Sequence, residues 1–108
     1  MGAYRFPRGV MVRELAQIDV DAGTADSFEA AVGRAVALFD ATAGCTGIRL
    51  YRSVEVPNRY WLVVEWGTID QHTEFRNSPT FGHWRVLVGE FFAASPVVEH
   101  LDQVVLGF

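Results

Sequence analysis

Hydrophobic positions recur with two different periods along the chain, and these periods predict its regular structure. Four segments have the alternation, or the β-branched and aromatic composition, of strands: residues 10–20, 45–55, 59–66 and 97–108. Three segments predict helices, at residues 24–42, 69–77 and 78–95. In two of them apolar residues recur every three or four positions, and the first helix places one set on a single face: Phe28, Val32, Ala35 and Phe39.

Residues suited to turns and helix ends lie between these segments. Thr24 is the expected N-cap of the first helix, and Gly44 ends that helix. The sequence Val-Pro-Asn-Arg at 56–59 provides a turn between the second and third strands, which therefore form an antiparallel hairpin. Ser78 and Pro79 begin the last helix as its cap and its first helical residue.

The order strand, helix, strand, strand, helix pair, strand is the split βαβ arrangement of a ferredoxin-like fold. We therefore expect residues 10–108 to form one α+β domain, a four-stranded antiparallel sheet with helices on one face, after an N-terminal extension of residues 1–9. Segment 59–66 is apolar at nearly every position, as in strands buried on both faces. Because an uncovered apolar sheet face is unstable in water, we also expect a twofold homodimer in which two sheets pack together.

Composition excludes several classes of partner. The net charge is −4 and the nine basic residues, all Arg, are scattered, which argues against nucleic acid. No apolar run approaches the roughly 20 residues of a membrane span, and the first residues lack the apolar core of a signal peptide. The single cysteine, Cys45, cannot form an internal disulfide, so a cytoplasmic location is expected.

His72 is the main candidate for chemistry, because it precedes Phe75 by three residues and shares its face of the predicted helix 69–77. A neutral imidazole with a reference pKa near ~6.5 could take a proton from a phenol or an enolisable carbon. Removal of that proton makes the compound electron-rich enough to react with oxygen. The alternative is a core histidine whose two nitrogens bond to backbone or side-chain groups.

Aromatic residues near His72 could form the wall of a pocket for a ring-shaped molecule. Trp66 ends the third strand, and its indole N–H could bond a substrate carbonyl while its ring stacks on the substrate. Phe81 and Trp84 fall on the apolar stripe of the last helix and could line the same pocket. Ordinary core packing is the alternative for all three aromatic residues.

The remaining reactive side chains show no pattern of a site. His83 lies off the apolar stripe and is expected at the surface, whereas His100 lies in the last strand and could sit at a dimer seam. The histidines and Cys45 lack metal-ligand spacing, so no metal is expected. Arg76 and Arg85 could bind an acidic substrate group, although solvated helix faces also explain them.

Residues 43–84, TAGCTGIRLYRSVEVPNRYWLVVEWGTIDQHTEFRNSPTFGHW, resemble the antibiotic biosynthesis monooxygenase domain, a family of dimeric α+β barrel proteins. The similar elements are the Gly-Cys start, the LYRS strand, the PNRY turn, the strand that ends in Trp66, and NSPTF. The resemblance implies a pocket within each protomer, between the sheet and the helices. It also implies a small aromatic substrate such as an anthrone, with molecular oxygen as co-substrate and no cofactor.

The family residues carry over in part. The tryptophan that ends the third strand of the anthrone-oxidising members is present as Trp66. Those members have an asparagine four residues earlier and a tyrosine six residues later, where this chain has Leu62 and His72. Haem-degrading members use an asparagine, a tryptophan and a histidine. This chain has Ala16, Phe75 and Arg85 at those three places, so haem is disfavoured as a ligand.

The sequence therefore predicts a cofactor-independent monooxygenase that oxidises an aromatic polyketide or phenolic small molecule. His72 is the expected base and Trp66 the expected donor, with substrate contacts from Leu62, Phe75, Phe81 and Trp84. One alternative is a non-catalytic dimeric barrel that binds a small apolar ligand. Another is a polyketide cyclase or isomerase that uses the same base without oxygen.

Overall fold

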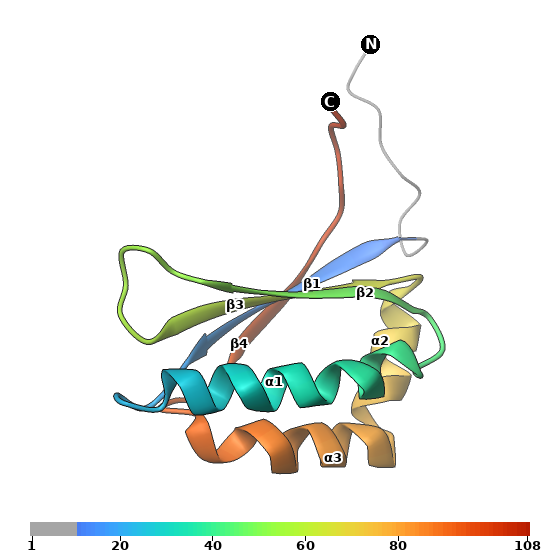
Figure 1. Cartoon of the computed structure of the whole chain (residues 1–108). Coiled ribbons are helices and arrows are strands. Elements are labelled where there is room, and N and C mark those ends of the chain that lie inside the picture. The colour runs from blue at the N-terminus through green and yellow to red at the C-terminus, as the bar shows by residue number, and fades with distance from the viewer. Residues whose placement is uncertain (1–10) are drawn as a thin grey trace.

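A four-stranded sheet and the helices that cover one of its faces form the two layers of the fold (Figure 1). The computed structural model describes residues 11–108, so the expected extension of residues 1–9 lies outside the described residues. In chain order the elements are β1 (Val12–Asp19), α1 (Ala25–Asp40), β2 (Cys45–Arg52), β3 (Arg59–Trp66), α2 (Ile69–Arg76), α3 (Pro79–Val88), the short 3₁₀ helix η1 (Gly89–Phe91) and β4 (Val97–Leu101).

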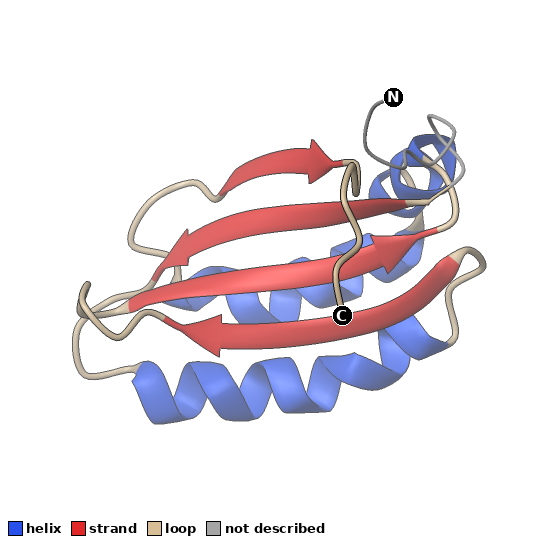
Figure 2. Cartoon of the chain, turned by 90° about the horizontal axis from the view of Figure 1, so that it is seen from above, coloured by secondary structure: helices blue, strands red, loops and turns tan. Residues whose placement is uncertain are grey.

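The sheet is antiparallel, with strand order β2-β3-β1-β4. This arrangement confirms the predicted ferredoxin-like α+β fold. Figure 2 looks onto the sheet and shows the helices behind the strands. Within residues 11–108, no helix covers the face turned toward the viewer.

The two central strands, β1 and β3, turn alternate side chains toward the helices. Their register places Val12 opposite Trp66, and Ala16 opposite Leu62. The inward-facing row of both strands is buried and consists of Val12, Glu14, Ala16, Ile18, Tyr60, Leu62, Val64 and Trp66. Glu14 is the one carboxylate in this otherwise apolar and aromatic row, which makes it the first unusual feature of the core.

The prediction that segment 59–66 is buried on both faces holds for only one face of the single chain. The other face of β3 carries Arg59, Trp61, Val63 and Glu65, which are partly exposed. The difference arises because the helices pack only against the opposite face of the sheet. The continuous apolar run thus indicates a second surface that one chain leaves open.

Two strands are shorter than predicted. β2 ends at Arg52 and β4 ends at Leu101, whereas the sequence pattern continues to residues 55 and 108. Asn58, in the loop after β2, adopts a positive φ of 63°, which asparagine tolerates better than most residues.

None of the helices among residues 11–108 is long and apolar enough to cross a membrane.

The two predicted helix caps differ in their hydrogen bonds. Ser78 accepts a hydrogen bond from the backbone N–H of Phe81, and α3 begins at Pro79, as predicted. Thr24 occupies the N-cap position of α1, but its hydroxyl donates to the carbonyl oxygen of Asp21 at 2.6 Å. The predicted N-cap position of Thr24 is therefore confirmed, but its side chain does not cap the helix because the preceding turn takes that hydroxyl.

Candidate functional site

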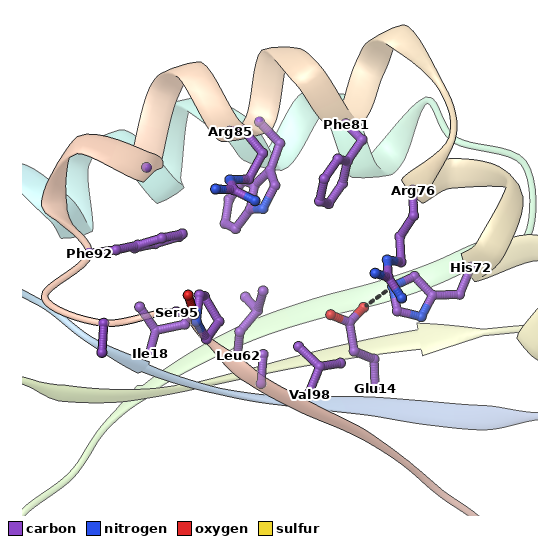
Figure 3. A pocket seen from close by; sticks show the side chains of 15 residues that line it. Glu14, Ile18, Leu62, His72, Arg76, Phe81, Arg85, Phe92, Ser95 and Val98 are labelled. Atoms are coloured by element: carbon purple, nitrogen blue, oxygen red, sulfur yellow. Dashed lines mark ion pairs between the residues drawn. The ribbon is translucent and has the colours of Figure 1, made fainter.

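A cavity of about 670 Å³ lies between the sheet and the helices (Figure 3). This volume is within the usual range of small-molecule pockets, roughly 300–1,000 Å³. Ala16 and Ile18 of β1 and Leu62 of β3 form its apolar floor on the sheet. Phe81 and Trp84 of α3 form an aromatic wall on the helical side. The cavity can thus accommodate a flat apolar molecule between the two layers.

One end of the cavity is polar, because Glu14 of β1 and His72 of α2 meet there. Glu14 Oε1 lies 3.1 Å from His72 Nε2 and accepts a hydrogen bond from Trp66 Nε1 at 3.0 Å. The other ring nitrogen of His72, Nδ1, lies 2.7 Å from Nε2 of His100 in β4. The four side chains form a continuous row of close polar contacts across three strands and one helix.

Glu14 is held in an environment that favours its neutral form. Burial is the largest influence and raises the pKa of the Glu14 carboxyl above its ordinary value. The hydrogen bond from Trp66 and the positive charge of Arg76 act in the opposite direction. A carboxylate whose pKa is raised in this way is a stronger base than an exposed glutamate, which suits it to proton removal.

His72 is neutral at neutral pH. Burial, together with the electrostatic influence of His100 and Arg76, lowers the pKa of His72 to about 4. When the proton of the neutral ring is on Nε2, it faces the Glu14 carboxylate at the 3.1 Å contact, and Nδ1 accepts a hydrogen bond from His100. Both nitrogens of His72 are then engaged with protein groups, and its ring stacks on Trp66 with centroids 5.0 Å apart.

The second carboxylate oxygen of Glu14, Oε2, has a different environment from Oε1. Among residues 11–108 it has no hydrogen bond or ion pair, whereas Oε1 accepts a hydrogen bond from Trp66 and lies 3.1 Å from Nε2 of His72. Figure 3 shows this second oxygen turned away from His72 and toward the open space. The cavity therefore presents a carboxylate oxygen without a protein partner to whatever occupies it.

Two arginines line the cavity at the edge that faces solvent. Arg76 follows His72 by one helical turn of α2, and Arg85 projects from α3. Arg85 places its guanidinium 5.7 Å from the centroid of the Phe92 ring. Neither arginine forms an ion pair with another residue in the described part of the chain.

The predicted site residues fall into two groups. His72, Leu62, Phe81 and Trp84 line the cavity, whereas Trp66 and Phe75 are buried behind its wall. The indole N–H of Trp66 is occupied by Glu14. Phe75 packs between three other aromatic rings, with centroid distances of 5.0 to 5.6 Å to Phe39, Trp66 and Phe81.

The sequence interpretation missed Glu14 and did not place His100 at the site. A signal for Glu14 exists, since it is the charged residue in the alternating row of an otherwise apolar strand face. His100 reaches the site because β4 pairs with β1 in a register that places it directly opposite Glu14. No local pattern in the sequence predicts the register between β1 and β4.

The other candidate residues lie elsewhere. His83 is exposed on α3, as predicted. Cys45 is half-buried at the start of β2, and burial raises the pKa of its thiol. Within residues 11–108, no three His, Cys, Asp or Glu side chains are grouped so that they could hold a metal ion.

Comparison with known proteins gives several matches. Residues 11–86 match the model of the family described as antibiotic biosynthesis monooxygenase. The uncharacterized protein YczJ of Bacillus subtilis is 35% identical over 95 residues, which cover 87% of this chain and 100% of YczJ. The crystal structure of a Bordetella bronchiseptica protein that carries the same family name is 47% identical and has a TM-score of 0.87, with 91% of this chain and 100% of that chain covered.

More distant structures share the fold. SnoaB from Streptomyces nogalater, described as a cofactor-independent oxygenase, has a TM-score of 0.72 at 18% identity, with 85% of this chain and 91% of that chain covered. At this identity the likeness concerns the fold alone. The family match over residues 11–86 and the close relatives together carry the assignment: the chain belongs to the antibiotic biosynthesis monooxygenase family.

Proposed function

We propose that the protein is a cofactor-independent monooxygenase that oxidises an aromatic polyketide or phenolic small molecule with dioxygen. The observation that carries this proposal is the free carboxylate oxygen of Glu14 at the polar end of an apolar cavity. An apolar pocket with a few convergent polar groups and a titratable group of shifted pKa is typical of an active site. Membership of the family and the oxygenase described for SnoaB support the choice of reaction.

Glu14 begins the reaction by taking a proton from the substrate. An anthrone, used here as the model substrate, loses a proton from the methylene carbon of its central ring and becomes an electron-rich enolate. The guanidinium of Arg76 lies close enough to lower the pKa values of both Glu14 and His72. Its positive charge stabilises the negative charge that develops on the enolate. Positioned proton removal of this kind contributes roughly 10²- to 10⁴-fold to a rate.

Dioxygen then completes the oxidation without another reductant. The enolate transfers an electron to dioxygen, and the two radicals combine to form a carbon–oxygen bond. Protonation of the resulting peroxide and loss of water give a ketone. The balance is one anthrone and one dioxygen to one anthraquinone and one water, so the substrate supplies all the electrons. One oxygen atom enters the product and the other leaves as water.

His72 and Trp66 hold Glu14 in place for this step. The sequence predicts His72 as the base, but both of its ring nitrogens are engaged, so we assign the accepting atom to Glu14 Oε2. His72 lines the cavity and contacts Oε1, the oxygen of Glu14 that does not accept the proton. Trp66 acts through its N–H on Glu14, as a positioning residue behind the wall. Leu62, Phe81 and Trp84 would contact the rings of the substrate.

Oxygen consumption tests the proposed function. With 1,8-dihydroxyanthrone as substrate, the wild-type protein is expected to consume one dioxygen per molecule and to release the matching anthraquinone. His72→Ala removes the imidazole nitrogen that lies 3.1 Å from Glu14 Oε1 and opens the cavity, so its rate is expected to fall at least tenfold. An oxygen electrode and chromatography of the product provide the measurement.

His83→Ala is the matched control, because it removes an exposed histidine from α3 and is expected to keep the wild-type rate. A protein-free blank at the same pH corrects for spontaneous oxidation of the anthrone. Binding of the anthrone without oxygen consumption would rule out the oxygenase. A changed product formed without oxygen would favour a cyclase or isomerase, and an unchanged compound would favour a non-catalytic binding protein.

We also propose that two copies of the chain pack through the open face of the sheet. This face carries partly exposed apolar side chains from neighbouring strands, including Leu15, Tyr51, Trp61 and Val63. Trp61→Glu places a charge among them and is expected to convert a twofold dimer to a monomer. Sedimentation velocity measures the mass, and a monomeric wild-type protein at micromolar concentration would contradict the proposal.

A further inference from the structure

The arginines of the structure differ in whether they have acidic partners. Arg13 and Arg49 approach Glu65, Arg52 approaches Glu29, and Arg59 is bonded to Asp19 at 2.8 Å. Those ion pairs lie along the sheet and its edges. The two arginines that line the cavity, Arg76 and Arg85, have no such partner among residues 11–108. The cavity is thus lined by two arginines that form no ion pair within the described residues.

The balance of charge differs between the Glu14 end of the cavity and the side formed by α3. Arg76 lies beside the Glu14–His72 pair, and its positive charge acts on both of those groups. It therefore compensates the one carboxylate among the cavity-lining residues. Arg85 is left without a compensating charge. Figure 3 shows it on α3, apart from Glu14 and between Phe81 and Phe92.

Arg85 is also placed to bind a planar ligand group. Its guanidinium lies 5.7 Å from the centroid of the Phe92 ring, so an apolar surface supports one side of the group. Trp84 and Phe81 of the same helix line the adjacent wall. A guanidinium presents several N–H donors in one plane, and this geometry suits a carboxylate better than a neutral oxygen.

We propose that the ligand of this cavity is an aromatic compound with an acidic side group, and that Arg85 binds its carboxylate while the rings lie between the sheet and α3. This inference deepens the proposed function, on which it rests for the choice of an aromatic ligand. The ring position that loses a proton then lies at the Glu14 end, and the acidic group lies away from it. Arg85 sets the orientation of the ligand and takes no part in proton removal.

Binding of two matched probes tests this inference without any reaction. Anthraquinone-2-carboxylate and anthraquinone-2-carboxamide have the same rings and differ in charge, and both are already oxidised. Calorimetric titration of the wild-type protein is expected to give at least about tenfold tighter binding of the carboxylate, the strength of a charge-assisted hydrogen bond. Arg85→Gln is expected to remove this preference and to leave the affinity for the carboxamide within about twofold. Arg85→Lys, which keeps the charge but loses the planar fork, is expected to fall in between.

Arg34→Gln provides the control for net charge, because Arg34 is exposed on α1 and lies outside this cavity. It is expected to keep the full preference for the carboxylate. Equal affinities of the wild-type protein for both probes, a preference that survives in Arg85→Gln, or binding of neither probe would each overturn the inference. Because neither probe consumes oxygen, these outcomes are independent of whether the protein is an oxygenase.

Discussion

Replacement of Glu14 by glutamine is expected to lower the rate of oxygen consumption with 1,8-dihydroxyanthrone by roughly 10²- to 10⁴-fold. The amide has nearly the same shape as the carboxyl group, and its oxygen can still accept the hydrogen bond from Trp66. It cannot accept a proton from the substrate. The variant is therefore expected to bind the anthrone with nearly wild-type affinity, so the loss should occur in kcat and not in KM.

Glu74→Gln is the matched control, since Glu74 is exposed on α2 and is expected to have no influence on the rate. Thermal unfolding monitored by circular dichroism shows whether each variant is folded. If Glu14→Gln retains a rate within about twofold of the wild type, then proton removal by a positioned base at Glu14 is excluded. In that case His72 is the remaining candidate base in the cavity wall.

Replacement of Trp66 by phenylalanine is expected to shift the pH dependence of the reaction. The base must be ionised to act, so the wild-type rate rises with pH through the pKa of Glu14, which burial raises above its ordinary value. The hydrogen bond from Trp66 lowers that pKa. Its loss raises the pKa further, and the rising part of the profile of kcat/KM against pH moves to higher pH.

Stability is expected to fall in the same variant. Glu14 Oε1 loses one of its donors while it stays buried, which costs about 1–3 kcal/mol in the free energy of unfolding. The sign of the pH dependence follows from the raised pKa. A carboxyl group with a raised pKa in the folded state stabilises the fold at low pH, and this contribution is lost as the pH rises through that pKa. The loss of stability in Trp66→Phe should therefore increase with pH.

Trp61→Phe is the control for the loss of a tryptophan from β3, because Trp61 lies on the opposite face of the sheet. Its pH profile is expected to match that of the wild type. A direct hydrogen bond from Trp66 to the substrate would give a different result. If the indole N–H bonded the substrate, Trp66→Phe would raise KM and leave the pH of the rising limb unchanged.

The fold could be predicted from the sequence because its signals are local. Apolar periods and composition located the four strands, apolar periods located α1 and α3, and Ser78 with Pro79 marked the start of α3. Where the prediction failed, a tertiary contact decided the outcome. β4 ends at Leu101 although the apolar pattern continues, since its pairing with β1 extends only over residues 97–101. One row of β3 side chains is likewise partly exposed because the helices cover only the other face of the sheet.

The candidate site was predictable only in part. The spacing of His72 and Phe75 correctly placed both side chains on the buried side of α2. It could not show that His72 lines the cavity while Phe75 lies within an aromatic cluster behind it. Glu14 and His100 are 86 positions apart and meet only through the β1–β4 register. A charged residue in the inward row of a strand is the local signal that deserved more weight.

The arrangement also explains how an ordinary scaffold can hold a reactive group. β1 supplies Glu14 from within the core, where neighbouring apolar residues raise its pKa. β3 and α2, which follow one another in sequence, supply the Trp66 N–H that bonds one of its oxygens and the His72 ring nitrogen that lies 3.1 Å from it. The other oxygen remains available to the cavity. The chemistry therefore depends on rigid elements and not on a mobile loop.

Hydrogen–deuterium exchange in the absence of oxygen tests most directly whether Glu14 removes a proton from the substrate. The anthrone is incubated with protein in D₂O under nitrogen, and loss of the methylene proton signal is followed by NMR against a protein-free blank. The wild-type protein is expected to accelerate the exchange, and Glu14→Gln is expected to reduce the acceleration by roughly 10²-fold or more. Exchange at the same rate with wild-type protein, with Glu14→Gln and in the blank would contradict the proposed role of the Glu14 carboxylate.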